Sequence, residues 1–318
     1  MAYRFVPQRP FDIGSDLLAL IGNTPLVPIR RINGVPSGVA VFAKLEGHNP
    51  GGSVKDRPVL RIIEDAERDG RLTRDRIILD STSGNAGIAY AMIGAAKGYG
   101  VTLLVPRNIS DERRGALLAY GAELIFTDPL EGSDGAMLEA RRLAAAEPRR
   151  YAYLDQYDNP SNWRAHYDGT GPEIIAQTHG RITHFVAGVG TTGTLVGVGR
   201  RLRETDPAVE IVAVEPDDGF HGIEGLKHLP TAITPGIYDP TVPHRTARVS
   251  SGAAYAMTHR LAADEGILVG PSSGAAMAAA VEVAGRLDRG VIVVIFPDRG
   301  DRYLSTNLWR PKVDLRTV

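Results

Sequence analysis

The chain has 318 residues and a mass of 34.1 kDa, and 43% of its residues are hydrophobic and 23% charged, which excludes a disordered or fibrous protein. With a net charge of −1 the chain has no overall positive field that would attract nucleic acid, and its apolar runs are too short for a membrane-spanning helix. The lack of cysteine excludes disulfides and thiolate metal sites. We therefore expect a cytoplasmic protein with no nucleic-acid or membrane partner.

From residue 76 onward, short apolar runs alternate with amphipathic stretches, which predicts βαβ units and an α/β fold. The predicted strands are apolar almost throughout, as expected for strands covered on both faces. They are Arg76–Asp80, Val101–Val105, Glu123–Phe126, Thr183–Val186, Glu210–Val214 and Val291–Phe296. The predicted helices are Pro58–Asp69, Ala86–Gly98, Asp111–Tyr120, Gly135–Ala146, Thr194–Glu204, Ala253–Glu265 and Ala275–Leu287. The stretch Pro216–Arg245 predicts a long loop, and the composition change near residue 150 predicts a domain boundary.

Lysine occurs five times in the chain, and Lys55 lies among glycine and serine residues just before a predicted helix. A single lysine is most often a solvated surface residue. Ligands of open α/β sheets, however, bind at the carboxyl ends of the strands, where glycine-rich turns of this chain also lie. A lysine beside a phosphate-binding turn is what a Schiff-base cofactor requires.

Two glycine-rich turns each follow a predicted strand and begin a predicted helix. Thr82–Gly87 offers small neutral donors, which suits a carboxylate or a ring oxygen, while ordinary helix capping is the alternative. Gly188–Gly193 matches the dinucleotide pattern GxGxxG, with Glu210 or Glu215 about 20 residues further on. Three hydroxyls at the same helix start favour a phosphate monoester instead, and a purely structural turn is the other alternative. These hydroxyls belong to Thr191, Thr192 and Thr194.

The remaining polar clusters indicate no further chemistry. Eight histidines show no metal-ligand spacing, so we expect no metal site. The charge run Asp111–Arg114 places acidic residues in the first turn of a predicted helix, and we interpret it as exposed helix surface.

Five motifs in a fixed order resemble the fold type II enzymes that depend on pyridoxal 5′-phosphate, and most closely the cysteine synthases (O-acetylserine sulfhydrylases) of the B-type branch. They are NPGGSVKDR (Asn49–Arg57), TSGNAG (Thr82–Gly87), GVGTTGTLVGVGR (Gly188–Arg200), GPSSGA (Gly270–Ala275) and PDRGDRYLST (Pro297–Thr306). The resemblance implies a fold like that of the tryptophan synthase β-subunit, with two open, mostly parallel sheets covered by helices. It also implies a smaller, movable domain over residues 46–150 and a larger domain over 1–45 and 151–318.

The resemblance also implies roles for residues of four of these motifs. Lys55 would bind the cofactor aldehyde and remove the Cα proton, Asn85 would bind the ring hydroxyl oxygen, and Ser272 would meet the pyridine nitrogen. The cofactor phosphate would be held by Gly190, Thr191, Thr192, Gly193 and Thr194. The substrate carboxylate would be bound by Thr82, Ser83 and Asn85, with Gln156 nearby.

The implied reaction is β-replacement on O-acetylserine or O-phosphoserine by sulfide or a thiocarboxylate, through α-aminoacrylate, to give L-cysteine. A homodimer is expected, with serine acetyltransferase or a sulfur-carrier protein as a further partner. The same cofactor would also serve cystathionine β-synthase, serine or threonine dehydratase, or the synthesis of another β-substituted alanine. A non-catalytic regulatory relative is a further alternative.

This chain departs from the family pattern at three positions. The family usually has threonine where Gly51 and Ala86 stand, and glycine where Thr192 stands. In the loop after residue 216, Lys227 occupies a region where some relatives that use O-phosphoserine carry a basic residue. We hypothesise that Lys227 pairs with a phosphate leaving group, and a surface lysine on a loop is the alternative.

Overall fold

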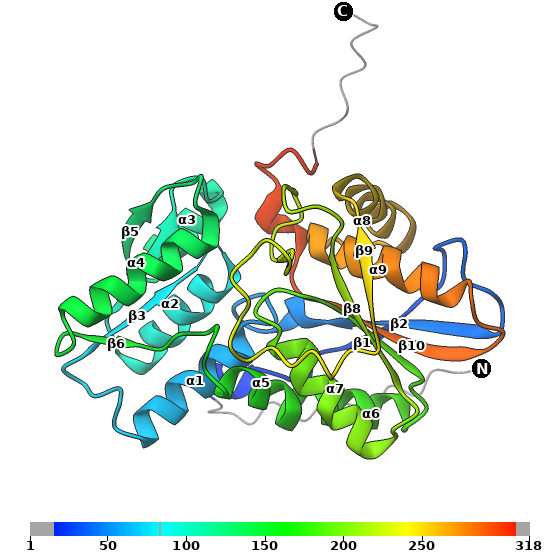
Figure 1. Cartoon of the computed structure of the whole chain (residues 1–318), viewed down its shortest axis with the longest axis horizontal. Helices are drawn as coiled ribbons and strands as arrows, with labels where there is room; N and C mark the ends of the chain where they lie inside the picture. Colours follow the sequence, from blue (N-terminus) through cyan, green and yellow to red (C-terminus); the bar gives the residue numbers. More distant parts are fainter. Residues whose placement is uncertain (1–15, 83, 310–318) are drawn as a thin grey trace, which may run out of the picture.

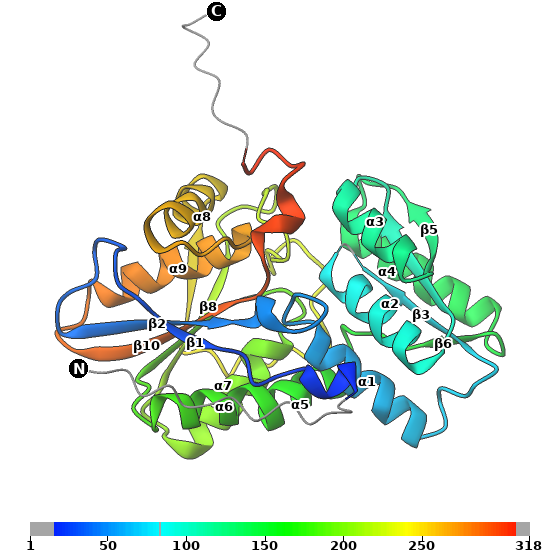
Figure 2. The ribbon, with the colours of Figure 1, turned by 180° about the vertical axis from the view of Figure 1, so that it is seen from behind.

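The protein is described by a computed structural model over residues 16–82 and 84–309. Two bodies lie side by side, and each is a sheet with helices on its faces (Figure 1). The view from behind shows the same two bodies, with α1 placed between them at the base (Figure 2). The α/β class with two mostly parallel sheets, predicted from the sequence, is confirmed.

The larger sheet has six strands in the order β1-β2-β10-β7-β8-β9. β1 runs antiparallel to β2, and the other neighbouring pairs are parallel. The strands are β1 (Leu26–Ile29), β2 (Val39–Leu45), β7 (His184–Gly188), β8 (Glu210–Pro216), β9 (Arg245–Val249) and β10 (Gly290–Phe296). One face packs against α8 (Ser251–Glu265) and α9 (Pro271–Ala284). The other face packs against α5 (Ser161–Ala165), α6 (Gly171–Thr178) and α7 (Gly193–Thr205).

The smaller sheet has four parallel strands in the order β5-β4-β3-β6. They are β3 (Ile77–Ser81), β4 (Val101–Pro106), β5 (Glu123–Thr127) and β6 (Tyr151–Tyr153). The helices of this body are α1 (Asp56–Arg68), α2 (Asn85–Lys97), α3 (Asp111–Ala119) and α4 (Gly132–Ala146). Because β6 pairs with β3, the smaller sheet continues past residue 150, where the sequence places the domain boundary.

Short helical segments connect these elements. They are the 3-10 helices η1 (Leu17–Leu20), η2 (Glu46–His48) and η4 (Gly300–Tyr303), and the π-helix η3 (His166–Thr170). The predicted strands and helices are present with small shifts at their ends, and the stretch between β8 and β9 is a loop as predicted. No helix among the described residues is long and apolar enough to cross a membrane.

Candidate active site

Lys55 lies at the start of α1, on a turn that is fastened to the segment after β10. The backbone N–H of Val54 donates to Pro297 O at 2.8 Å, and Ser53 forms an isolated antiparallel bridge with Asp298. The backbone N–H of Lys55 itself donates to Ser53 Oγ at 3.2 Å. These contacts place the lysine where the two bodies meet.

The surroundings of Lys55 favour its neutral form. Burial lowers the pKa of the Lys55 amine, and attraction to the Asp298 carboxylate opposes this effect. A lysine with a lowered pKa has a larger neutral fraction at a given pH, and the neutral amine is the nucleophile and the base.

Four charged side chains form a buried charge cluster beneath the lysine turn. Arg57 donates from Nε to Glu46 Oε2 at 2.6 Å and from Nη1 to Glu173 Oε1 at 2.7 Å, and Lys44 Nζ donates to Glu173 Oε2 at 2.7 Å. Asn49 Nδ2, from the lysine turn, donates to Glu46 Oε2 at 3.1 Å. The cluster therefore holds α1, α6, β2 and the lysine turn together.

A small cavity collects most of the residues that the sequence assigns to the cofactor. The predicted cofactor residues that line it are Lys55, Asn85, Gly190, Thr191, Thr192, Thr194 and Ser272. Gly193 begins α7 and faces Asn162 instead, where a Cβ atom would collide with the Asn162 side chain. The cavity lies at the N-terminus of α7, where backbone N–H groups attract anions.

Thr192 combines a strained backbone with an unpaired hydroxyl. Its φ of +70° is left-handed, a conformation that costs an L-residue about 1–2 kcal/mol and that glycine adopts freely. The residue is 2% exposed, and its Oγ1 has no hydrogen-bond partner in the described part of the chain. The glycine usual in the family would remove the strain, and the threonine offers a buried donor in its place.

His166 supports the same turn from below, and no sequence pattern indicates this role. Its Nε2 lies 3.3 Å from Thr194 Oγ1, and its Nδ1 lies 2.9 Å from Thr170 Oγ1. Burial lowers the pKa of His166 to about 3, so the ring is neutral at physiological pH. A neutral imidazole has one donor and one acceptor nitrogen and can therefore fix both hydroxyls.

The side chain of Asn85 is held by two residues of the PDRGDRYLST motif. Its Nδ2 donates to Asp298 Oδ2 at 2.6 Å, and its Oδ1 accepts from Arg302 Nη1 at 2.5 Å. Tyr303 also donates to Asp298 Oδ2, at 2.6 Å. The sequence places this motif in the family pattern without assigning a role to these three residues.

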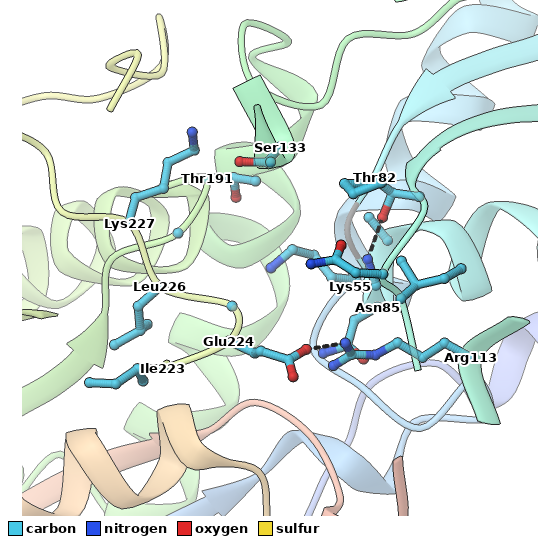
Figure 3. Close-up of a pocket in the computed structure, with 18 of the residues that line it drawn as sticks. Lys55, Thr82, Asn85, Arg113, Ser133, Thr191, Ile223, Glu224, Leu226 and Lys227 are labelled. Atoms are coloured by element: carbon cyan, nitrogen blue, oxygen red, sulfur yellow. Dashed lines mark hydrogen bonds and ion pairs between the residues drawn. The ribbon is translucent and has the colours of Figure 1, made fainter. Parts of the chain in front are cut away.

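The cavity shares lining residues with a larger chamber between the two bodies (Figure 3). Thr82, Gln156 and Lys227, three residues predicted to bind substrate, line this chamber, and so does Ala86. Lys55 and Asn85 line both spaces. The turns after β3 and β7 thus meet in one site, as the rule for open α/β sheets predicts.

Thr82 and Gln156, like Asn85, already have hydrogen-bond partners. Thr82 Oγ1 accepts from the N–H groups of Gly84 and Gly87, each at 3.0 Å, and so shapes its own turn. Gln156 Nε2 donates to Ser81 O at 2.8 Å. Ser83, the remaining predicted carboxylate ligand, lies outside the described residues.

Lys227 lies in the chamber wall with 8% of its side chain exposed. Its Nζ donates to Asp134 Oδ1 on α4 at 2.5 Å, and the ammonium also lies 5.1 Å from the centre of the Tyr157 ring. The surface alternative for Lys227 therefore does not hold. A phosphate group that reached Lys227 would compete with Asp134.

Arg113 was interpreted from the sequence as exposed helix surface, and this interpretation is wrong. Its side chain is 4% exposed, lines the chamber, and forms an ion pair with Glu224 of the loop after β8. Its guanidinium lies 4.8 Å from the centre of the Tyr303 ring. Residues distant in sequence cover this end of α3, so its local charge pattern could not reveal the burial.

Gly51 allows the carboxylate of Asp56 to approach the lysine turn closely. The N–H of Gly51 donates to Asp56 Oδ2 at 2.5 Å, and a Cβ atom on Gly51 would touch the same carboxylate. Asp56 is buried, and its Oδ1 has no partner among the residues described. Burial raises the pKa of Asp56 to about 7.

Residues 17–298 match the model of the family described as "Pyridoxal-phosphate dependent enzyme". The chain belongs to this family. It is 50% identical over 302 residues to cysteine synthase of Aquifex aeolicus, which covers 93% of this chain and 92% of the relative. It is 46% identical over 295 residues to cysteine synthase B of Escherichia coli, covering 93% of this chain and 96% of the relative.

Solved structures give the same relationship. Cysteine synthase of Entamoeba histolytica has a TM-score of 0.90 and 35% identity, covering 98% of this chain and 95% of that one. An O-ureido-L-serine synthase has a TM-score of 0.86 and 40% identity, covering 92% and 94%. The resemblance to the fold type II enzymes and the expected cofactor, pyridoxal phosphate, are thus confirmed.

Proposed function

We propose that this enzyme forms L-cysteine by replacing the β-substituent of an activated L-serine with a sulfur nucleophile. The observation that carries the proposal is the meeting of Lys55, the threonine turn before α7 and Ser272 in one cavity, which shares lining residues with the chamber. The cysteine synthases among its relatives, similar over nearly the whole chain, support the same reaction.

We assign the cofactor to the smaller cavity because the groups there fit it. The buried hydroxyl of Thr192 has no acceptor among the described residues, and a phosphate at the N-terminus of α7 would supply one. Thr191, Thr194 and the backbone of Gly190 and Gly193 complete this phosphate site. Asn85 is assigned to the ring hydroxyl, Ser272 to the ring nitrogen and the Lys55 amine to the aldehyde carbon.

When bound, pyridoxal phosphate withdraws electrons from the Cα of an amino acid and so acidifies its proton. The neutral amine of Lys55, favoured by burial, accepts this proton. The Ser272 hydroxyl does not force protonation of the ring nitrogen as a carboxylate would, which favours loss of the β-substituent over transamination.

We assign the substrate carboxylate to the turn at Thr82, Ser83 and Asn85, with Gln156 beside it. We also propose that residues 46–150, together with β6 of the same sheet, form the movable domain, which closes over the substrate, and that residues 1–45 and the chain after β6 form the larger domain. Ion pairs between α3 or α4 and the loop after β8 support this division, because closure would make and opening would break them.

We assign Lys227 to the leaving group, with O-phosphoserine as the preferred substrate. The ammonium of Lys227 faces the chamber, and a phosphate dianion would compete with Asp134 for it more strongly than a neutral acetyl group would. Lys227→Ala should lower kcat/KM for O-phosphoserine by roughly 10- to 100-fold and change that for O-acetylserine little. An equal loss for both substrates, or a wild-type preference for O-acetylserine, would contradict this assignment.

We further propose a cytoplasmic homodimer that associates with serine acetyltransferase or with a sulfur-carrier protein. The family resemblance and the absence of cysteine support this setting. Light scattering on the purified protein tests the dimer, and co-purification with each candidate partner tests the association.

The deciding experiment is product analysis. The holoenzyme is given O-acetylserine or O-phosphoserine together with sulfide, and the L-cysteine formed is quantified by chromatography. Parallel reactions with homocysteine, with cyanide or without a nucleophile test cystathionine, another β-substituted alanine and pyruvate as the main product. Cysteine as the fastest product supports the proposal. Another main product, or no reaction with any activated serine, would overturn it.

A further inference from the structure

Two ion pairs join the two bodies across the mouth of the chamber. Arg113 on α3 pairs with Glu224, and Asp134 on α4 pairs with Lys227, where both Glu224 and Lys227 belong to the loop after β8. In Figure 3, Arg113 and Glu224 point toward one another, and Lys227 lies on the far side of the chamber. In each pair the cation is buried and the carboxylate is more accessible.

The Arg113 guanidinium has donors to spare. One nitrogen, Nη1, donates to Glu224, while Nε is buried without a hydrogen-bond partner among the residues that the structure describes. A guanidinium carries five N–H donors in a planar fork. Stacking on the Tyr303 ring fixes the plane of this fork.

The same guanidinium lies against the turn that we assign to the substrate carboxylate. A Cβ atom built on Gly84 would stand 3.1 Å from both Nε and Cζ of Arg113. Gly84 follows Thr82 and Ser83 in this turn and precedes Asn85. Arg113 therefore faces the carboxylate turn, at the opposite side of the chamber from Lys227.

Breaking the Arg113–Glu224 ion pair would cost Arg113 more free energy than Glu224. The Glu224 side chain is 41% exposed and would regain water, whereas Arg113 at 4% would remain a buried cation. A buried charge that loses its partner is strongly destabilising. When the chamber opens and Glu224 leaves, a second anion at Arg113 would restore the balance.

We propose that Arg113 binds the α-carboxylate of the amino-acid substrate and that Glu224 occupies this place when the substrate is absent. The inference rests on the proposed function, since it concerns the same reaction. A carboxylate can match the planar fork of arginine with two parallel hydrogen bonds, of which Glu224 makes one, whereas a sulfide ion has no second acceptor atom. Arg113 is thus a substrate-binding residue, and Glu224 is an internal competitor.

Two variants of this one ion pair separate the proposal from a structural role. Arg113→Gln removes the binding site, so affinity for the substrate carboxylate should fall roughly 10- to 100-fold. Glu224→Gln removes the competitor and keeps the shape, so affinity should rise roughly 2- to 5-fold. A merely structural ion pair is broken in both variants and would change affinity in the same direction.

The binding probe is L-alanine, which has no β-substituent that can leave, compared with L-alaninamide, which lacks the carboxylate. Calorimetric titration of the holoenzyme should show the two opposite changes for alanine and no change for the amide. In turnover, Arg113→Gln should raise KM for the activated serine and leave KM for sulfide unchanged. Arg113→Lys, which keeps the charge but loses the fork, should recover part of the affinity.

Arg114→Gln is the matched control, because it removes the same charge from α3 at a residue outside the chamber lining. The proposal is overturned if Arg113→Gln binds alanine as tightly as the wild type, if both variants shift affinity in the same direction, or if the KM for sulfide rises instead. Failure of the wild type to form cysteine would refute the proposed function, whereas alanine binding would still report on Arg113.

Discussion

Thr192 offers a test in which one residue affects protein stability and cofactor affinity in opposite directions. Its left-handed backbone costs about 1–2 kcal/mol relative to glycine, and its buried hydroxyl without an acceptor among the described residues costs about 1–3 kcal/mol. Both costs apply to the cofactor-free protein. A bound phosphate would accept from the hydroxyl and remove the second one.

Thr192→Val removes the hydroxyl and keeps the shape and the β-branch. Cofactor-free Thr192→Val should therefore gain about 1–3 kcal/mol in the free energy of unfolding, because no unpaired donor remains. Its affinity for pyridoxal phosphate should fall roughly 10- to 100-fold, because a hydrogen bond to a charged phosphate is lost. Thr192→Gly should in addition remove the cost of the left-handed backbone. This further gain in the free energy of unfolding is reduced by about 0.5–1 kcal/mol because glycine loses more backbone entropy on folding.

Urea unfolding of the cofactor-free proteins measures the first effect, and titration with pyridoxal phosphate, followed by visible absorption, measures the second. Thr192→Ser is the control, because it keeps the hydroxyl and should bind the cofactor like the wild type. If Thr192→Val is less stable than the wild type, the hydroxyl has a partner and the argument fails. Unchanged cofactor affinity in Thr192→Val would place the phosphate elsewhere.

Two further predictions concern the lysine turn. Lys55→Ala should lower kcat by roughly 10²- to 10⁴-fold or more and abolish the visible absorption of the bound cofactor, whereas Lys97→Ala, whose amine pairs with Glu67 far from the chamber, should keep both. The pKa of Asp56 is raised to about 7 in the folded protein, whereas in the unfolded chain this carboxyl loses its proton near pH 4. The contribution of Asp56 to the free energy of unfolding therefore declines as the pH rises from 4 to 7. Asp56→Asn should remove this decline and be relatively more stable at pH 8, by roughly 2–4 kcal/mol in urea unfolding. The same pH dependence in Asp56→Asn as in the wild type would exclude this origin.

The sequence predicted the parts of the site that are carried by short motifs. Lys55 and the threonine turn could be selected because glycine, hydroxyl residues and a rare lysine stand together near predicted helix starts, whereas Ser272 was assigned through the resemblance to the family. The parallel strands that bring these turns to one place could be recognised from their continuous apolar character. Local pattern was sufficient for these elements.

The sequence could not reveal contacts that depend on distant packing. Arg113 stands in a charge run that is typical of a helix surface, and its burial comes from Glu224 and Tyr303, which are more than a hundred residues away. β2 was not predicted, and its Lys44 is charged yet buried because Glu173 of α6 meets it. No local signal distinguishes such a charge from a solvated one.

The buried charge cluster beneath the lysine turn has a consequence for mutational libraries. Its two cations and two carboxylates share hydrogen bonds. Replacing any one of them therefore leaves a buried charge without its partner and lowers the free energy of unfolding by about 3–5 kcal/mol. Replacing all four together by apolar residues of similar volume carries no such penalty. A scan that changes one position at a time will therefore score these sites as intolerant, and combinatorial randomisation is needed to find the alternatives that the scaffold accepts.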